Sequence, residues 1–168
     1  MPRGVVREIT PAPSAAVFAL LHDYERRLEW DTLLRAAYLT DGYRQAECGA
    51  VAVCQGRRHL GGIALKTRYV SFRAPAIAAI QMINQPPFFE KFAATIRHRD
   101  LPRGGSLVEY IYNFQARPRR LRWILHPVMQ WCFAWETRKR LRALKSFFAR
   151  QPEYGAKGVA CPGGGGRA

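Results

Sequence analysis

Hydrophobic and polar residues alternate in several runs within the first 116 positions of the chain, most clearly where Ile63, Leu65, Thr67 and Tyr69 alternate with Lys66 and Arg68. Such alternation is typical of strands that have one covered face and one solvated face. Turn residues separate the runs and predict strands over residues 4–10, 36–40, 49–55, 62–72, 76–84, 88–98 and 106–116. Because consecutive strands joined by short turns pair antiparallel, we expect one antiparallel sheet of about six to seven strands.

Two short helical segments follow the first strand. Ser14 can cap a helix whose apolar residues recur at positions 17, 20, 21 and 24. A second short helix is predicted around residues 27–34, where it carries Trp30 and Asp31. The order of elements is therefore one strand, two short helices and then a run of strands without helical interruption.

The apolar period becomes helical from about residue 119 to residue 150, a span of roughly 45 Å at 1.5 Å per residue. Inside this helix Pro127 predicts a kink or a division into two segments. The stretch 131–135, WCFAW, is apolar in every direction. Such a helix either fills a thick core or faces a further apolar partner, which can be a ligand in a cavity, a membrane or a second chain. Strands followed by one long helix predict an α+β fold.

The length and composition fit one folded domain. With 168 residues, of which 48% are hydrophobic, the chain can bury one sizeable core. We expect the domain to occupy residues 1–150 and the Gly-rich residues 151–168 to form a disordered tail. No apolar run has the length of a membrane-spanning helix or a signal peptide, so a cytoplasmic location is predicted. The four cysteines are expected to be reduced thiols.

Positive charge is concentrated in the predicted C-terminal helix. The chain has a formal net charge of +15, and residues 117–150 hold ten Lys and Arg against one Glu. Arg138, Arg142 and Lys145 form a basic stripe at helical spacing and are the predicted contact with a membrane or an acidic partner. A plain solvated helix face is the alternative. Nucleic acid is disfavoured as a partner, because the basic residues flank an apolar helix and do not interleave with exposed aromatic residues.

The sequence contains no recognisable catalytic or metal-binding motif. Cys and His do not occur at zinc-ligand spacing, and no phosphate-binding loop or nucleophile elbow is found, so no metal and no cofactor are expected. Asp31 and Glu109 are isolated carboxylates, and Asp31 is expected to hold the short helix. The histidines fall in four different elements, and each is expected to be a surface or hydrogen-bonded residue: His22, His59, His98 and His126. Catalytic residues therefore stay unassigned.

Two segments, together with the order of elements, carry a resemblance to a known superfamily. They are APSAAVFALLHDYERRLEWD at 12–31 and the terminal RLRWILHPVMQWCFAWETRKRLRALKSFF at 120–148. Over about residues 3–150 the chain resembles the START/SRPBCC superfamily, which includes polyketide cyclase/dehydrase-type and lipid-transfer proteins. The resemblance implies the helix-grip fold, in which a curved antiparallel sheet wraps around the long C-terminal helix and leaves a hydrophobic cavity between them.

Within such a fold, strand alternation and the helix pattern nominate residues that line the cavity. The set is apolar and includes tyrosines whose hydroxyls could orient a polar head group. Its members are Trp30, Leu65, Tyr69, Phe92, Tyr110, Tyr112, Met129, Phe133 and Trp135. Each could equally be plain core, and a one-residue bulge would reverse the inward face of any strand.

The leading hypothesis is binding or transport of a hydrophobic small molecule, such as a lipid, an isoprenoid quinone or a polyketide, with docking on anionic membrane through the basic helix. The alternative is an enzyme of polyketide cyclase/aromatase type, which needs at least two polar groups in reacting geometry inside the cavity. A third hypothesis is a module that binds nucleic acid or an acidic protein. The WCFAW segment could equally form a homodimer interface.

Overall fold

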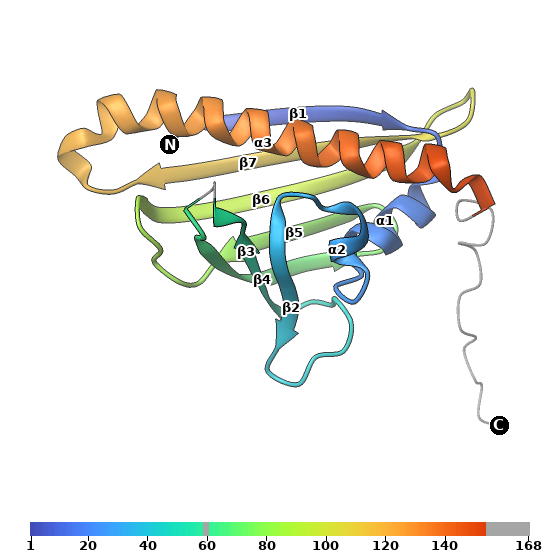
Figure 1. Ribbon diagram of the computed structural model, residues 1–168, viewed down its shortest axis with the longest axis horizontal. Helices are drawn as coiled ribbons and strands as arrows, with labels where there is room; N and C mark the ends of the chain where they lie inside the picture. Colours follow the sequence, from blue (N-terminus) through green and yellow to red (C-terminus); the bar gives the residue numbers. More distant parts are fainter. Residues whose placement is uncertain (59–60, 154–168) are drawn as a thin grey trace.

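A computed structural model describes residues 1–58 and 61–153 of the chain (Figure 1). Seven strands form one sheet in the order β1-β7-β6-β5-β4-β3-β2, and every neighbouring pair is antiparallel. The strands are β1 (Arg3–Thr10), β2 (Leu34–Thr40), β3 (Val51–Gly56), β4 (Ala64–Arg73), β5 (Ile77–Met82), β6 (Phe89–Asp100) and β7 (Ser106–Ala116). The helices are α1 (Ser14–His22), α2 (Arg27–Trp30), the 3-10 turn η2 (Arg119–Leu121) and α3 (Arg122–Arg150). All seven predicted strands are confirmed, with ends within two residues of prediction.

The sheet curves around α3, which runs alongside β1 and β7 (Figure 1). The strand register shifts at three places, between Leu34 and Ala36 on β2, between Tyr69 and Ser71 on β4 and between Phe89 and Lys91 on β6. An extra residue in one strand bends that strand and increases its twist. The predicted helix-grip fold of the α+β class is therefore confirmed.

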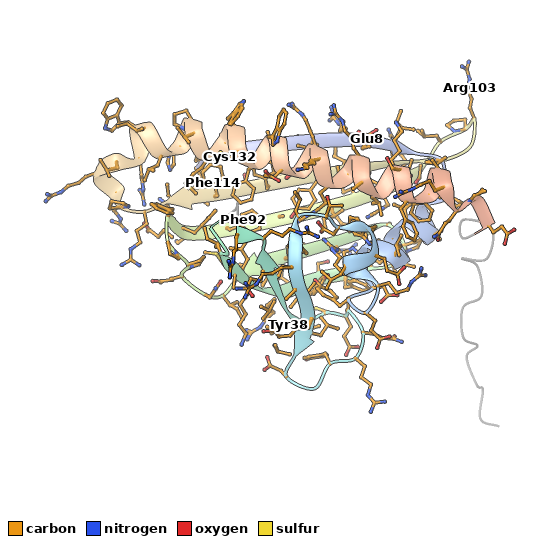
Figure 2. The ribbon with its side chains drawn as sticks, viewed as in Figure 1. Glu8, Tyr38, Phe92, Arg103, Phe114 and Cys132 are labelled. Carbon is orange, nitrogen blue, oxygen red and sulfur yellow. The ribbon has the colours of Figure 1, made fainter. Side chains whose placement is uncertain are left out.

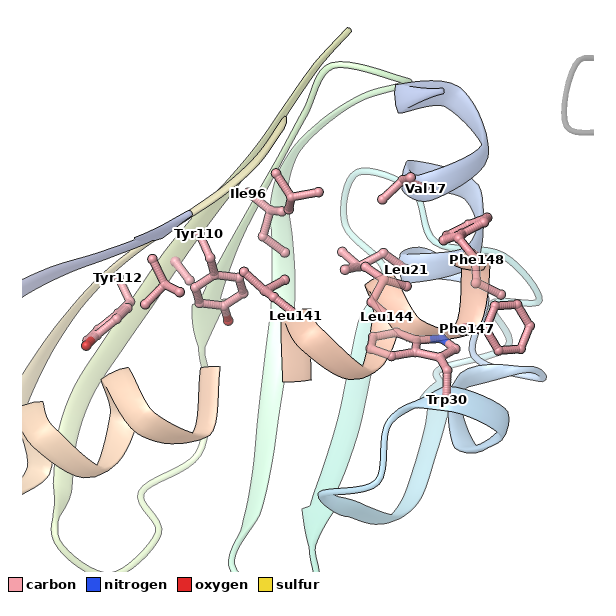
Figure 3. Packing of buried hydrophobic residues seen from close by; sticks show 14 of the residues in the cluster. Val17, Leu21, Trp30, Ile96, Tyr110, Tyr112, Leu141, Leu144, Phe147 and Phe148 are labelled. Carbon is pink, nitrogen blue, oxygen red and sulfur yellow. The ribbon is translucent and has the colours of Figure 1, made fainter. Parts of the chain in front are cut away.

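The core lies between the sheet, α1 and the C-terminal half of α3 (Figure 3). Leu141, Leu144 and Phe148 of α3 are almost completely buried and belong to the same cluster as Val17 and Leu21 of α1. Each fully buried side chain of this size contributes roughly 1.5–3 kcal/mol of transfer free energy. This packing holds α3 on the sheet.

The start of α1 is held by a neighbouring strand and not by its own capping side chain. Ser14, predicted as the cap, is the first helical residue, and Pro13 precedes it without a side-chain hydrogen bond. The Ser14 backbone N–H and hydroxyl donate to Asp100 at 2.7 and 2.9 Å. A carboxylate at a helix N-terminus satisfies free N–H groups and favours the helix dipole. Asp100 therefore ties α1 to the end of β6.

Of the two alternatives predicted at Pro127, a kink or a division into two segments, the division is wrong, because the C-terminal helix runs without interruption through the proline. The proline removes the hydrogen bond to the carbonyl of Trp123, in the second turn, where the chain is exposed and water can replace the lost partner. No helix within the described residues has the length and apolarity to cross a membrane. The predicted Gly-rich tail lies outside the described residues from position 154 onward.

Candidate functional site

A cavity of about 240 Å³ lies between the concave face of the sheet and α3. One end of it is apolar, and its walls come from β4, β5, β6 and α3. The apolar lining residues include Leu65, Ile80, Phe89, Phe92, Ile96 and Phe133. The hydrophobic cavity that the resemblance implies is therefore present.

Phe133 brings the helix into contact with the sheet at this apolar end. Its ring lies 5.4 Å from that of Phe92, nearly parallel, and 5.5 Å from that of Phe89, edge to face. Phe92 and Phe114 both lie beneath α3 in Figure 2. Offset and edge-to-face pairs are the favoured arrangements of aromatic rings. They give the cavity a rigid aromatic wall.

The other end of the cavity is polar and begins with a chain of hydrogen-bonded side chains. The Tyr69 hydroxyl lies 2.8 Å from His22 Nδ1 and 3.0 Å from the Tyr24 hydroxyl. Burial lowers the pKa of His22 well below its ordinary value and raises the pKa of Tyr69 to about 12. At neutral pH the imidazole is therefore uncharged and the phenols keep their protons.

A charged cluster lies beside this chain. Arg27 Nε donates to Asp31 Oδ2 at 3.1 Å, and Arg140 Nε from α3 lies 2.9 Å from the same oxygen. The Arg140 N–H is not aligned for a hydrogen bond, so this second contact is an ion pair only. Asp31 Oδ1 also accepts the backbone N–H of Leu33 at 3.3 Å. As expected, Asp31 holds the short helix, and it also anchors α3.

Further polar groups reach the cavity from α3. Glu136, Thr137 and Arg140 all line it. Glu136 Oε2 is buried and has no hydrogen-bond partner among the described residues, and the same holds for His22 Nε2. Sequence reasoning missed these groups. The available signal was a Glu and an Arg four residues apart on the helix face that also carries Phe133.

The structure brings five of the nine nominated residues to the cavity: Leu65, Tyr69, Phe92, Tyr110 and Phe133. The other four lie elsewhere. Trp30 is buried behind the cavity, with the Arg27 guanidinium 4.6 Å from its ring, and Met129 packs against the core. Tyr112 is covered by β1, which can cross its ring because position 4 is glycine, where a Cβ would lie 2.1 Å from the ring. Trp135 is 56% exposed and stacks on Trp131.

The outer face of α3 carries exposed apolar side chains in its first half. We call this set the outer apolar stripe: Trp123, Ile124, Val128, Trp131 and Trp135. Exposed basic residues continue the face beyond it, and Arg138, Lys139 and Arg142 form no ion pair with a described residue. The third predicted contact, Lys145, instead pairs with Glu8 at 2.9 Å. Cys132 is exposed and also lines the cavity, so at this residue only one side chain lies between the cavity and the surface beside this stripe.

Comparison with known proteins gives a family match and a set of similar folds. The model of the family described as polyketide cyclase/dehydrase and lipid transport matches residues 4–148. The ZhuI aromatase/cyclase from Streptomyces sp. R1128 is 14% identical, with a TM-score of 0.73 over 90% of this chain and 95% of that one. The protein XoxI from Bacillus cereus is 17% identical, with a TM-score of 0.70 over 91% and 99%.

A START superfamily protein from Mycobacterium smegmatis is also similar, at 11% identity and a TM-score of 0.62 over 84% of this chain and 98% of that one. A search of curated proteins finds no match. At these identities the solved structures bear on the fold alone.

Proposed function

Since the chain belongs to the polyketide cyclase/dehydrase and lipid transport family of the START/SRPBCC superfamily, we propose that it binds and carries a hydrophobic small molecule with one polar end. The observation that carries this proposal is the two-ended cavity, with aromatic walls at one end and buried polar groups at the other. An apolar pocket with a few convergent polar groups is the usual form of a small-molecule site.

The size of the cavity limits the ligand. A volume of about 240 Å³ lies below the roughly 300–1,000 Å³ of pockets for drug-sized ligands, so the buried part of the ligand is compact. Lipid chains, isoprenoid quinones and polyketides all offer such an apolar portion. Phe92 and Phe133 would contact it, and Tyr69 and Tyr110 would face its polar end.

Native mass spectrometry of the gently purified full chain, followed by organic extraction, tests the proposal. We expect a stoichiometric apolar adduct on the wild-type protein. Leu65→Trp should abolish the adduct because the larger side chain fills the cavity. Val70→Trp is the matched control, since Val70 lies on the same strand but is exposed. A wild-type protein that stays free of ligand after incubation with lipids and quinones would rule the carrier function out.

The same proposal includes docking on an anionic membrane surface through α3. Arg138 and Arg142 supply positive charge, and the outer apolar stripe supplies tryptophans, which favour the boundary between headgroups and acyl chains. We place the protein in the cytoplasm, where the membrane leaflet is anionic. Cosedimentation should show binding to vesicles that contain phosphatidylserine, weaker binding at high salt, and little binding to pure phosphatidylcholine.

The position of Cys132 supports this arrangement. Cys132 lies both at the cavity and at the surface, one residue after Trp131 of the outer apolar stripe. A ligand that leaves the bilayer at this point would enter the cavity without crossing bulk water. Docking and loading would then use two faces of one helical segment.

An aromatase/cyclase-type enzyme is the second candidate function. The polar groups that favour it are His22, Tyr69 and Glu136, which share one cavity. In the reaction expected, an enol carbon of a linear poly-β-ketone attacks a ketone carbon of the same chain and one water leaves. Incubation with such a substrate would give a cyclised product with the wild type and much less with Tyr69→Phe. Equal product with both proteins would exclude a role for the Tyr69 hydroxyl, and no more product than in the absence of protein would exclude this function.

A further inference from the structure

The charged groups at the polar end of the cavity balance one another. Arg27 and Arg140 are the positively charged lining residues, and both are paired with Asp31 behind the cavity wall. Glu136 supplies the second negative charge, four residues before Arg140 on the same helix. Because burial keeps the imidazole of His22 neutral, the described polar end carries two positive and two negative charges. It therefore holds no spare positive charge for an anion.

The same end has a buried acceptor that lacks a donor. Glu136 Oε2 is shielded from solvent and receives no hydrogen bond from any described residue. A carboxylate can only accept hydrogen bonds, and a buried acceptor without a donor is costly. A ligand that carries an O–H group would supply the missing donor.

The next inference rests on the proposed function. We propose that the cavity selects a ligand whose head group is uncharged and carries a hydroxyl: a long-chain alcohol, a phenol, a quinol or an enol. The ligand hydroxyl donates to Glu136 Oε2. The hydroxyl of Tyr110 lines the same cavity, and it keeps its proton because burial raises its pKa. It can donate in turn to an oxygen of the ligand.

A carboxylate or phosphate head group fits this end poorly. It would bring a further negative charge close to Glu136 while both arginines already face Asp31. In a site of low polarity, like charges repel strongly and a charge without a partner is expensive to bury. Fatty acids and anionic phospholipids are therefore predicted to be rejected at the cavity, although anionic lipids suit the outer face of α3.

A matched pair of probes tests the selection. Binding of para-hexylphenol and para-hexylbenzoate to the full chain is measured by isothermal titration calorimetry at pH 7.5, where only the benzoate is charged. We expect the wild type to bind the phenol at least roughly tenfold more tightly. Glu136→Gln should lower the ratio of the phenol affinity to the benzoate affinity, since the amide removes the negative charge that repels the benzoate. Glu29→Gln is the control, because Glu29 is exposed and pairs with Arg26.

The outcomes separate the two proposals. The selection is supported if the wild type binds the phenol more tightly than the benzoate and the ratio of the two affinities falls in Glu136→Gln but not in Glu29→Gln. Equal binding of both probes, tighter binding of the benzoate, or a ratio unchanged in Glu136→Gln overturns the selection and leaves the cavity function standing. Binding of neither probe overturns the cavity function and the selection together. A thermal melt of each variant shows whether it is folded.

Discussion

The two halves of α3 differ in what they bury. Residues 137–150 place Thr137, Leu141, Leu144, Phe147 and Phe148 in the interior. Residues 122–136 contain no buried residue, although they hold three of the four tryptophans of the chain. One continuous helix is therefore anchored by its second half and offers an apolar outer face along its first half.

The difference shows that hydrophobicity in a helix does not by itself assign a residue to the core. The inner face of the first half is already occupied by Phe133, which meets the aromatic rings of the sheet. The tryptophans point away from it and remain 56–77% exposed. A cluster of exposed aromatic side chains marks an interaction surface.

The largest expected effect contrasts one substitution in each half. Leu144→Ala removes a fully buried side chain and should lower the free energy of unfolding by about 2–5 kcal/mol. Trp131→Ala removes an exposed ring and should change the free energy of unfolding by less than about 1 kcal/mol. Urea denaturation followed by circular dichroism measures both. Equal losses in the two variants would mean that the halves are anchored alike.

The anchored half should also be sensitive to acid, through His98 on β6. His98 is buried and neither ring nitrogen has a hydrogen-bond partner among the described residues, so the expectation of a surface or hydrogen-bonded histidine is wrong here. Its ring packs against Phe18 of α1, the helix whose neighbouring Val17 shares a core cluster with Leu144 of α3. Burial lowers the pKa of His98 to about 4, whereas the unfolded chain has a value near about 6.5. The unfolded state therefore binds the proton first as the pH falls. The stabilisation is complete above pH 6.5 and is lost progressively between about 6.5 and 4, by about 3 kcal/mol.

Urea denaturation at pH 7.5 and pH 4.5 measures this loss. His98→Phe keeps an aromatic ring in the aromatic cluster and removes the titrating group, so the drop in stability should be smaller in that variant. Other groups also titrate in this range, and the comparison of the two proteins isolates the share of His98. An identical pH dependence in wild type and variant would mean that groups other than His98 cause the loss of stability at low pH.

Much of the fold could be predicted from the sequence, because the patterns that encode it are local. The period of two along each strand and the turn residues between strands placed all seven strands. Leu65 and Tyr110 reached the cavity because no bulge interrupts the alternation around them, and Phe92 reached it because it lies beyond the bulge of β6. The bulge after Tyr69 then shifts the phase and turns Phe72 inward, where it packs on Phe18. No local signal announced that shift.

The polar end of the cavity depends on contacts between distant residues and could not be predicted in the same way. Asp31 and Arg140 lie more than a hundred positions apart in the sequence, and only the fold brings them to 2.9 Å. In the WCFAW segment every position is apolar, so the sequence pattern does not indicate which side of the helix faces the core. Phe133 and Trp135 are about 200° apart on the helix, and nothing local decided which of them faces inward.

The unanchored half of α3 should matter for membrane binding and not for stability. Trp131→Ala combined with Trp135→Ala should weaken binding to phosphatidylserine vesicles by about 2 kcal/mol, or roughly thirtyfold, because two apolar rings no longer leave water. Tyr38→Ala is the control, since Tyr38 is an exposed aromatic residue on β2, away from α3 (Figure 2). Loss of binding in the control, or none in the double variant, would exclude the outer apolar stripe as the contact.

The smallest effect distinguishes two basic residues of the anchored half. Arg142 has no ion-pair partner among the residues described, whereas Lys145 pairs with Glu8. One free basic residue near an anionic surface contributes about 1 kcal/mol, so Arg142→Gln should weaken vesicle binding roughly fivefold at low salt. Lys145→Gln should weaken it less, because its charge is already partly neutralised by a carboxylate. The difference should vanish at high salt, since screening removes the attraction of both. Equal losses in the two variants would show that the Glu8 pair opens when the protein docks.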